Sequence, residues 1–273
     1  MRVLSLVALA IGLALTPPAS AQQARSQGTQ PRRPTPPPPA RTPPRTEPAA
    51  AFRVGETLTY DVGWQTFLVA GSAITKVVER RQSSGSTAYY VVAEGRPLPL
   101  IARIYTLYYK MDSLFDSTTA LSQKSSLYSE EGTRRRTATT TFDRRARKAR
   151  FEVFTETTVK DEFAVPQNVQ DGLATLYSLR SRTFKAGDKI TVPIADDGSL
   201  YTANFEVSGP ENVSVPMGDV KAWNLKVTVL NAAREPVGSN IVAWISADNR
   251  KLPVKLQASL PVGKFALSLR TVE

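Results

Sequence analysis

Apolar and polar residues alternate along most of the chain, and this period of two constrains the fold more than any other feature. Leu58, Tyr60 and Val62 alternate with threonine and aspartate, and similar runs recur as far as the C-terminus. Successive side chains of a β-strand point to opposite faces, so this alternation is typical of half-buried strands. Turn sequences such as residues 82–86 and 196–198 separate the runs. We therefore predict an all-β, mainly antiparallel fold.

The turns are short, so each strand should pair with the next one along the chain. We assign about 12 strands, which makes the fold an antiparallel meander. Such a meander should form a barrel or a strongly curved half-barrel, because closure removes exposed sheet edges. One helix should be inserted at residues 166–182, where apolar residues recur at helical spacing and Asn168, Gln170 or Asp171 can act as the N-cap.

The N-terminus has the three parts of a secretory signal peptide. Arg2 supplies a positive charge, residues 3–15 are almost entirely apolar, and Ala-Ser-Ala at residues 19–21 matches the A-x-A cleavage pattern. An apolar stretch of about 13 residues is too short to span a bilayer, which needs roughly 20. We predict that residues 1–21 are removed during export to the periplasm. No cysteine follows the stretch, which excludes lipoprotein acylation, and no later segment reads as a transmembrane helix.

Residues 22–48 are rich in proline and arginine. This composition cannot bury a hydrophobic core, and its prolines favour extended polyproline II structure. We predict a disordered tether here, followed by a single β-rich domain over residues 49–273.

The chain is basic, with 35 basic and 24 acidic residues. The signal peptide and tether hold six of the basic residues and one of the acidic ones, which leaves the domain with a net charge of +6. Two clusters, at residues 134–136 and 144–150, carry much of this charge beside expected turns. We interpret them as solvated strand faces, or as contacts that the strands and the tether make with an anionic envelope surface. Nucleic acid is not expected as a partner, because exported proteins seldom meet it.

The amino-acid composition excludes most catalytic mechanisms. The chain has no histidine and no cysteine, which excludes serine–histidine and cysteine–histidine nucleophiles and makes a zinc site improbable. No serine is followed three residues later by lysine, and glycine-rich nucleotide-binding motifs are missing. We therefore predict a protein that is not an enzyme and has no catalytic residue, metal or cofactor.

Carboxylates are the remaining candidates for chemistry. Asp196 and Asp197 precede a glycine and should form a hairpin turn, with a calcium or glycosidase role as the alternative. Asp61, Asp112 and Asp116 lie on or near expected strands, but nothing in the sequence fixes their separation. A carboxylate-dependent hydrolase is accordingly the third of our functional hypotheses.

Aromatic residues are concentrated in the first half of the domain, beside a short apolar loop at residues 98–101. They can fill an ordinary barrel core, with tyrosine hydroxyls at its rim. Alternatively, they can line a cavity for a lipid or another apolar ligand, as barrels of this size are able to do. On that second interpretation the candidate ligand-binding residues are Tyr60, Trp64, Tyr105, Tyr108 and Tyr109.

Four segments together resemble a known family. The pattern F-x-V-G-E-x-L-x-Y-x-V-x-W begins at Phe52, and residues 171–180 (DGLATLYSLR) resemble the helix motif of that family. Residues 185–201 are similar to its hairpin, and W-x-S-x-D with a following basic residue and P-V occupies residues 244–254. The chain is thereby identified as a member of the domain-of-unknown-function family 3108 of exported bacterial proteins. In this chain Lys251, beside Arg250, stands at the arginine position of the signature.

The resemblance implies an envelope location and a β-rich, barrel-like domain, and it implies no activity. Our leading hypothesis is a periplasmic protein that binds an apolar or amphipathic envelope ligand in a barrel-like cavity. The alternative is a structural or assembly factor of the envelope with a packed interior. The two differ in whether the interior is hollow. As structural residues, Gly55 and Gly71 should serve turns or bulges, Trp64 and Trp244 the core, and Pro253 an edge strand.

Overall fold

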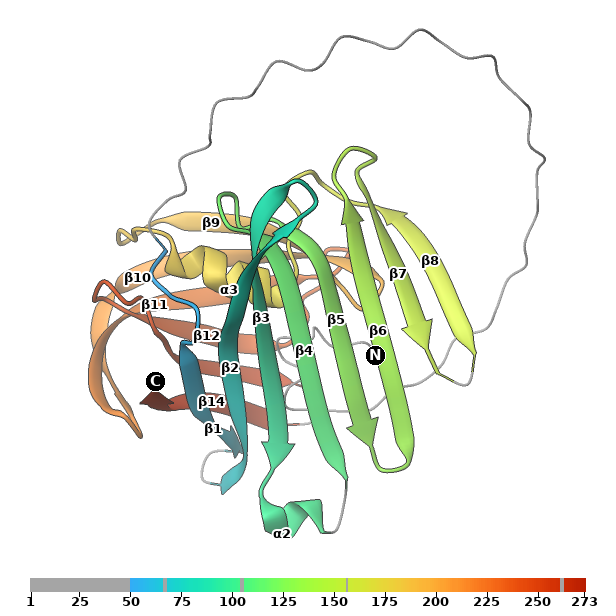
Figure 1. Cartoon of the computed structure of the whole chain (residues 1–273). Coiled ribbons are helices and arrows are strands. Elements are labelled where there is room, and N and C mark those ends of the chain that lie inside the picture. Colours follow the sequence, from blue (N-terminus) through green and yellow to red (C-terminus); the bar gives the residue numbers. More distant parts are fainter. Residues whose placement is uncertain (1–49, 66–67, 104–105, 156, 261–262) are drawn as a thin grey trace, which may run out of the picture.

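The computed structural model describes residues 50–65, 68–103, 106–155, 157–260 and 263–273. Over these residues the chain forms 14 strands and two short helices (Figure 1). All the strands belong to one sheet, and every neighbouring pair in it is antiparallel. The predicted signal peptide and tether lie outside the described residues.

The N-terminal half of the domain contributes eight strands and the helix α2 (Pro99–Ala102), and the strands are β1 (Thr57–Trp64), β2 (Leu68–Ser83), β3 (Ser86–Pro97), β4 (Leu107–Asp116), β5 (Ser122–Glu131), β6 (Arg134–Asp143), β7 (Lys148–Phe154) and β8 (Thr158–Ala164). The C-terminal half begins with the helix α3 (Gly172–Arg180) and contributes β9 (Lys189–Asp196), β10 (Ser199–Val215), β11 (Gly218–Leu230), β12 (Ser239–Ser246), β13 (Pro253–Leu260) and β14 (Gly263–Val272).

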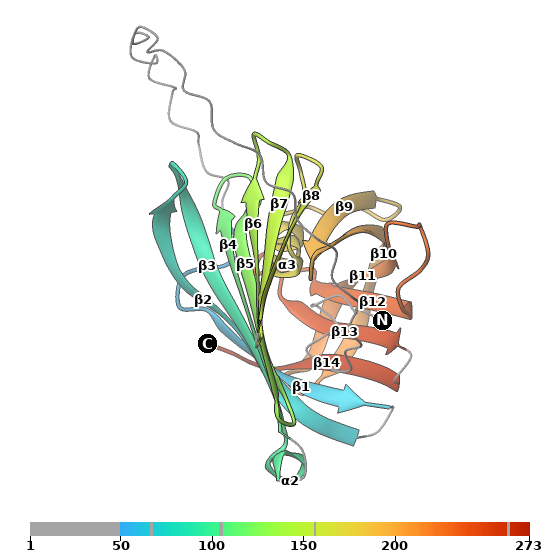
Figure 2. The ribbon, with the colours of Figure 1, turned by 90° about the vertical axis from the view of Figure 1, so that its right-hand side faces the viewer.

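The order of strands explains how the two halves are joined. It runs from β8 back to β1, then from β14 back to β9, so the first and last strands pair at the centre of the sheet. The sheet bends until its two halves face each other, and α3 lies between them (Figure 2). The edges β8 and β9 do not pair in the described residues, so the sheet stays open. The predicted all-β fold is confirmed, in its curved half-barrel form.

Some element boundaries differ from the predictions. The inserted helix is shorter than residues 166–182, because Gln170 forms a parallel bridge with Ile194 and Asp171 becomes the N-cap. The apolar loop at residues 98–101 forms most of α2, which ends one residue later at Ala102. Strand β8 was not predicted, since six of its seven residues are exposed and no alternation marks them.

The predicted hairpin turns depend on residues with positive φ. Asp197 and Gly198 have φ values of 47° and 71°, and they connect β9 to β10 as expected. Gly71 lies beside a β-bulge, where a Cβ atom would come within 2.4 Å of the carbonyl oxygen of Arg96. Glycine is therefore required at this close approach of two backbones.

Two structural assignments were wrong. Pro253 is not on an edge strand: it is the first residue of β13, which lies between β12 and β14. A first position suits proline because it lacks an N–H to donate. Trp64 is 43% exposed at the end of β1, whereas Trp244 is buried as expected.

The core occupies the space between the two halves of the sheet. Apolar side chains from the inner faces of β9–β14 form one cluster, which includes Leu225 and Ile245. A second cluster is aromatic and joins the N-terminal half to α3 through Phe52, Phe115 and Tyr177. Neither helix of the described chain has the length and hydropathy that a membrane-spanning helix requires.

Candidate functional site

The helix α3 brings together the polar groups of the interior. Eight of its nine residues are buried, because it lies between the two halves of the sheet and packs against β4 and β9. A helix buried on every side must satisfy its charged and capping groups within the protein. Two polar centres result, one at each end of α3, and we name them the Arg180 centre and the Asp171 pocket.

The Arg180 centre is built on a buried ion pair. Arg180 is 1% exposed and Glu56 is 8% exposed. Two guanidinium nitrogens of Arg180 donate to the two carboxylate oxygens of Glu56, over 2.5 and 2.9 Å. This two-bond geometry is the strongest that a guanidinium and a carboxylate can form.

Three backbone carbonyls complete the shell around Arg180. Its guanidinium donates to the carbonyl oxygens of Ala51 at 3.3 Å, Arg250 at 3.1 Å and Lys251 at 3.0 Å. The segment before β1, the end of α3 and the turn before β13 therefore meet at one side chain. The signature position at Lys251 acts here through its backbone, so a lysine in place of arginine leaves this contact intact.

Aromatic rings cover the same guanidinium. Its central carbon lies 5.3 Å from the ring centres of both Phe52 and Tyr177, within the range of a cation–π contact. The two rings pack edge to face, with centres 4.7 Å apart. The charge is therefore shielded from water by rings as well as by hydrogen bonds.

Three hydroxyl groups lie beside this centre. The hydroxyls of Tyr60, Thr75 and Tyr177 are buried and make no hydrogen bond of good geometry within the described residues, although Thr75 faces both tyrosines. Burial raises the pKa of Tyr177 to about 12, and it raises the pKa of Tyr60 further. Both phenols are therefore neutral at physiological pH.

The Asp171 pocket lies at the other end of α3. One carboxylate oxygen of Asp171 accepts a hydrogen bond from the Ala174 N–H at 2.9 Å and caps the helix. The other accepts one from the Ser113 hydroxyl at 2.6 Å. The Asp171 N–H donates to the Ser122 hydroxyl at 2.7 Å. Burial raises the pKa of Asp171 above its usual range, although these hydrogen bonds oppose the shift.

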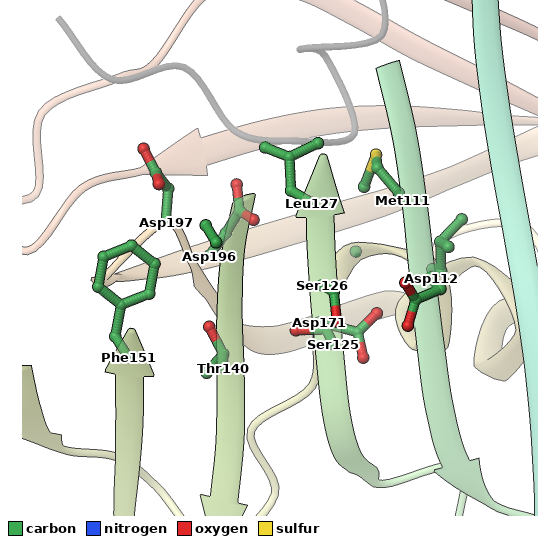
Figure 3. A pocket seen from close by; sticks show the side chains of 13 residues that line it. Met111, Asp112, Ser125, Ser126, Leu127, Thr140, Phe151, Asp171, Asp196 and Asp197 are labelled. Atoms are coloured by element: carbon green, nitrogen blue, oxygen red, sulfur yellow. The ribbon is translucent and has the colours of Figure 1, made fainter. Parts of the chain in front are cut away.

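The pocket beside Asp171 is small, and both polar and apolar side chains line it. It lies between the start of α3, the inner face of β4–β7 and the β9–β10 turn (Figure 3). Its volume is about 20 Å³. A buried water needs roughly 10–15 Å³, so the pocket has room for one or two waters and not for a lipid chain. Asp197, at its far wall, forms an ion pair with Arg136.

The predicted ligand-binding residues do not line one cavity. Tyr60 and Tyr109 lie in the same inner row of the sheet, separated by Ala73 and Gly95 on the two intervening strands. Tyr109 is buried and donates to Glu131 at 2.6 Å. By strand alternation, Tyr108 lies on the opposite, outer face.

Of the remaining two candidates, the structure describes one. Trp64 is exposed at the end of β1, and Tyr105 lies outside the described residues. The structure thus separates the four candidates that it describes rather than gathering them.

The candidate carboxylates also have structural partners. Asp61 pairs with Arg270, and Asp116 accepts hydrogen bonds from the β4–β5 turn, including the Thr119 N–H at 2.8 Å. Asp112 lies on β4 and is one of the residues that line the Asp171 pocket; burial raises its pKa, and the Ser126 hydroxyl opposes the shift. In the described part of the chain, no group of three carboxylates is placed to hold a metal ion.

Part of the basic charge has a structural role that sequence reasoning missed. Arg144 was interpreted as part of a solvated face, but its guanidinium donates to the carbonyl oxygens of Gln167, Val169 and Ser122. Glu56 and Arg180 were missed as well. Both lie within the segments that resemble the family, yet 124 residues separate them, and no local pattern indicates that they pair.

The fold and these centres define a class: an open, strongly bent antiparallel half-barrel whose interior is filled by a helix. The chain belongs to the family described as "protein of unknown function (DUF3108)", whose profile matches residues 59–270. No curated protein sequence shows significant similarity to the chain.

One solved structure shares the fold at low sequence identity, and two others are similar with lower TM-scores. A barrel-like protein of the domain of unknown function DUF1849 from Brucella abortus is 8% identical, with a TM-score of 0.52, over 81% of this chain and 97% of that one. A candidate lipoprotein from Parabacteroides distasonis is 9% identical, with a TM-score of 0.38, over 84% and 100% of the two chains. A candidate exported protein with a YmcC-like fold from Bacteroides fragilis is 8% identical, with a TM-score of 0.36, over 81% and 96%.

Proposed function

We propose that this protein is a non-enzymatic component of the bacterial cell envelope, a structural or assembly factor that acts through its surface around a packed interior. The packing of α3 between the two halves of the sheet is the observation that carries the proposal. The helix, the aromatic cluster and the Arg180 centre occupy the space where a barrel-like carrier would hold its ligand. The pocket beside them has a volume of about 20 Å³.

The alternative is the carrier of an apolar or amphipathic ligand. Ligand pockets usually have volumes of about 300–1,000 Å³. A carrier of this fold would therefore need α3 to leave the interior. That movement would separate Arg180 from Glu56 and leave the Glu56 carboxylate without its counter-ion, and breaking a buried ion pair is strongly destabilising. The geometry supports the packed interior better.

A periplasmic location forms part of the proposal. It is supported by the signal pattern of residues 1–21, by the A-x-A motif within it, and by the lack of a cysteine that could be acylated. A protein in this compartment without disulfides must derive its stability from its core, and the buried network around α3 meets that requirement.

Native mass spectrometry and organic extraction of the protein, purified from its own periplasm, would test the proposal. We expect the mass of the mature chain alone, no co-purifying lipid, and no binding of fluorescent fatty-acid probes. A lipid-binding protein purified in the same way provides the positive control. A reproducible lipid, lost when Tyr108 or Trp64 is replaced, would overturn the packed-interior function in favour of the carrier.

A further inference from the structure

Exposed apolar side chains gather at one end of the half-barrel. Leu100 in α2 is 70% exposed, and Leu98 beside it is 38% exposed. Trp64 at the end of β1 is 43% exposed, and Val69 at the start of β2 is 40% exposed. Of the nine large apolar residues in the described chain with such exposure, four therefore lie in or beside the β1–β2 and β3–β4 connections. We name this end the α2 tip.

Strand pairing confirms that these residues are neighbours. Trp64 pairs with Leu68, and the Leu98 N–H donates to the carbonyl oxygen of Ala70 at 2.9 Å. The β5–β6 turn lies at the same end, since the Gly132 N–H donates to the carbonyl oxygen of Thr106, at 2.8 Å. Figures 1 and 2 show α2 projecting beyond the strands, which makes the tip convex.

Basic side chains surround the tip. Arg96, Arg103 and Lys264 are exposed there, and the β5–β6 hairpin adds the exposed Arg134 and Arg135. The carboxylates of this region are fewer and less exposed. Glu94 pairs with Arg96 at 3.3 Å, and Glu130 lies 3.6 Å from Arg135. Glu131 accepts a hydrogen bond from the hydroxyl of Tyr109.

Tyrosine rings lie directly behind the basic residues, on the outer face. The Tyr108 and Tyr128 rings pack edge to face with centres 6.1 Å apart, and the Arg96 guanidinium lies 4.8 Å from the Tyr108 ring centre. Both rings are half-buried. An apolar tip surrounded by basic residues matches a bilayer, in which anionic head groups cover the acyl chains, and tyrosine and tryptophan favour the interface at the level of the head groups.

We propose that the α2 tip docks on an anionic lipid bilayer, with Leu98 and Leu100 entering the acyl region and the surrounding arginines contacting lipid phosphates. The convex shape favours a bilayer over a protein partner, because four apolar residues on a protruding tip cannot form the flat, closely packed core of a stable protein interface. The charge is complementary to anionic head groups. The inference goes beyond the packed-interior function and does not depend on it, since a hollow carrier could dock in the same way.

Vesicle binding by the full mature chain, residues 22–273, tests the proposal. The vesicles contain phosphatidylethanolamine and phosphatidylglycerol, and vesicles of phosphatidylcholine alone serve as the neutral comparison. We expect Leu100→Glu to weaken partitioning to anionic vesicles by about tenfold or more, and the pair Arg134→Glu/Arg135→Glu to weaken it similarly and to make the remaining binding less dependent on salt. Every variant keeps the basic tether, so its contribution is constant.

Matched control variants place the same changes elsewhere. Val54→Glu substitutes an apolar residue that is 46% exposed, next to Gly55, whose N–H contacts Val77 far along β2 from the tip. Arg145→Glu/Arg147→Glu makes the same charge change at the β6–β7 turn, at the opposite end of β6. Neither control should reduce the apolar contribution of the tip, so Val54→Glu should bind like the unchanged protein and the arginine pair should keep most of its binding.

Tryptophan fluorescence distinguishes insertion of the tip into the bilayer from adsorption of the basic tether to its surface. Brominated acyl chains in the anionic vesicles should quench the emission of Trp64, and the quenching should disappear in Trp64→Phe. Equal binding of Leu100→Glu and Val54→Glu, unquenched Trp64 at saturating lipid, or equal binding to phosphatidylcholine would each overturn the proposal. Circular dichroism confirms folding, and all the substituted residues are on the surface.

Discussion

The two ends of α3 each bury a charged residue, and they satisfy it differently. At the C-terminal end, Arg180 donates five hydrogen bonds, two to Glu56 and three to backbone carbonyls. At the N-terminal end, Asp171 is bonded to Ser113 and to the helix backbone, with a small pocket beside it. The fully paired end is a rigid joint between distant segments, whereas the other end tolerates a small amount of water and a shifted pKa.

Removal of the Arg180 partner should have the largest effect. Glu56→Ala leaves a buried guanidinium without its counter-ion, and Arg180→Ala leaves the carboxylate and three carbonyls without donors. We expect either change to lower the free energy of unfolding by about 3–5 kcal/mol. Urea denaturation, monitored by fluorescence, measures this change in the free energy of unfolding.

Arg250→Ala is the matched control for this prediction. Arg250 contributes only its carbonyl to the centre, while its exposed side chain pairs with Asp248. The substitution should lower the free energy of unfolding by less than about 1 kcal/mol. If Arg250→Ala and Arg180→Ala were equally costly, the joint would not be the ion pair that the geometry indicates.

The double variant Glu56→Leu/Arg180→Met separates the contribution of the ion pair from that of the hydrogen bonds to the carbonyls. Replacing a buried ion pair by apolar residues is often neutral. Here the carbonyls of Ala51, Arg250 and Lys251 would stay without a donor, at about 1–3 kcal/mol for each group that finds no water. We therefore expect the double variant to be more stable than Arg180→Ala and less stable than the unchanged protein.

The Asp171 end should be less sensitive. Asp171→Ala removes the N-cap and the partner of Ser113, and we expect a loss of about 1–3 kcal/mol. Asp171→Asn retains an oxygen for the cap and should cost less than half as much. An Asn variant as damaged as the Ala variant would show that the negative charge, and not the cap, is what the site requires.

The pH dependence of stability follows from the raised pKa of Asp171. A carboxyl whose pKa is raised on folding binds its proton more tightly in the folded state. Its contribution is therefore complete below the ordinary aspartate pKa of about 3.9 and is lost as the pH rises through the folded pKa. Asparagine does not titrate, so Asp171→Asn should gain stability relative to the unchanged protein over that rise. The urea midpoints of both proteins, measured at several pH values between acidic and neutral, report this difference in stability. If the two midpoints changed with pH in parallel, the raised pKa of Asp171 would be contradicted.

The comparison of the two ends also explains which features the sequence could reveal. Alternation along β1 and turns such as Asp197–Gly198 are local patterns, so the strands and hairpins could be predicted. The N-cap was also local, and Asp171 was among the residues proposed for it. The pairing of Glu56 with Arg180 is not local, because it depends on the first strand meeting the last at the centre of the sheet.

The positions of the candidate ligand-binding residues have a physical reason as well. Clustering of Tyr60, Tyr108 and Tyr109 in the sequence does not decide which face of a strand each occupies. Adjacent residues of one strand point to opposite faces, so Tyr108 and Tyr109 could never line one cavity together. The interior volume depends on how closely α3 approaches β4 and β9, which no periodicity encodes.

The smallest expected effect concerns the hydroxyls beside the Arg180 centre. Tyr60→Phe removes a buried hydroxyl that makes no good hydrogen bond, and should change stability by less than about 0.5 kcal/mol. Tyr109→Phe is the matched control: it removes a hydrogen bond to the carboxylate of Glu131 and should cost about 1.5–3 kcal/mol. Urea denaturation of both variants measures the difference. If Tyr60→Phe were the costlier change, the hydroxyls of Tyr60, Thr75 and Tyr177 would have to share a bound water, and the Arg180 end would be hydrated like the Asp171 end.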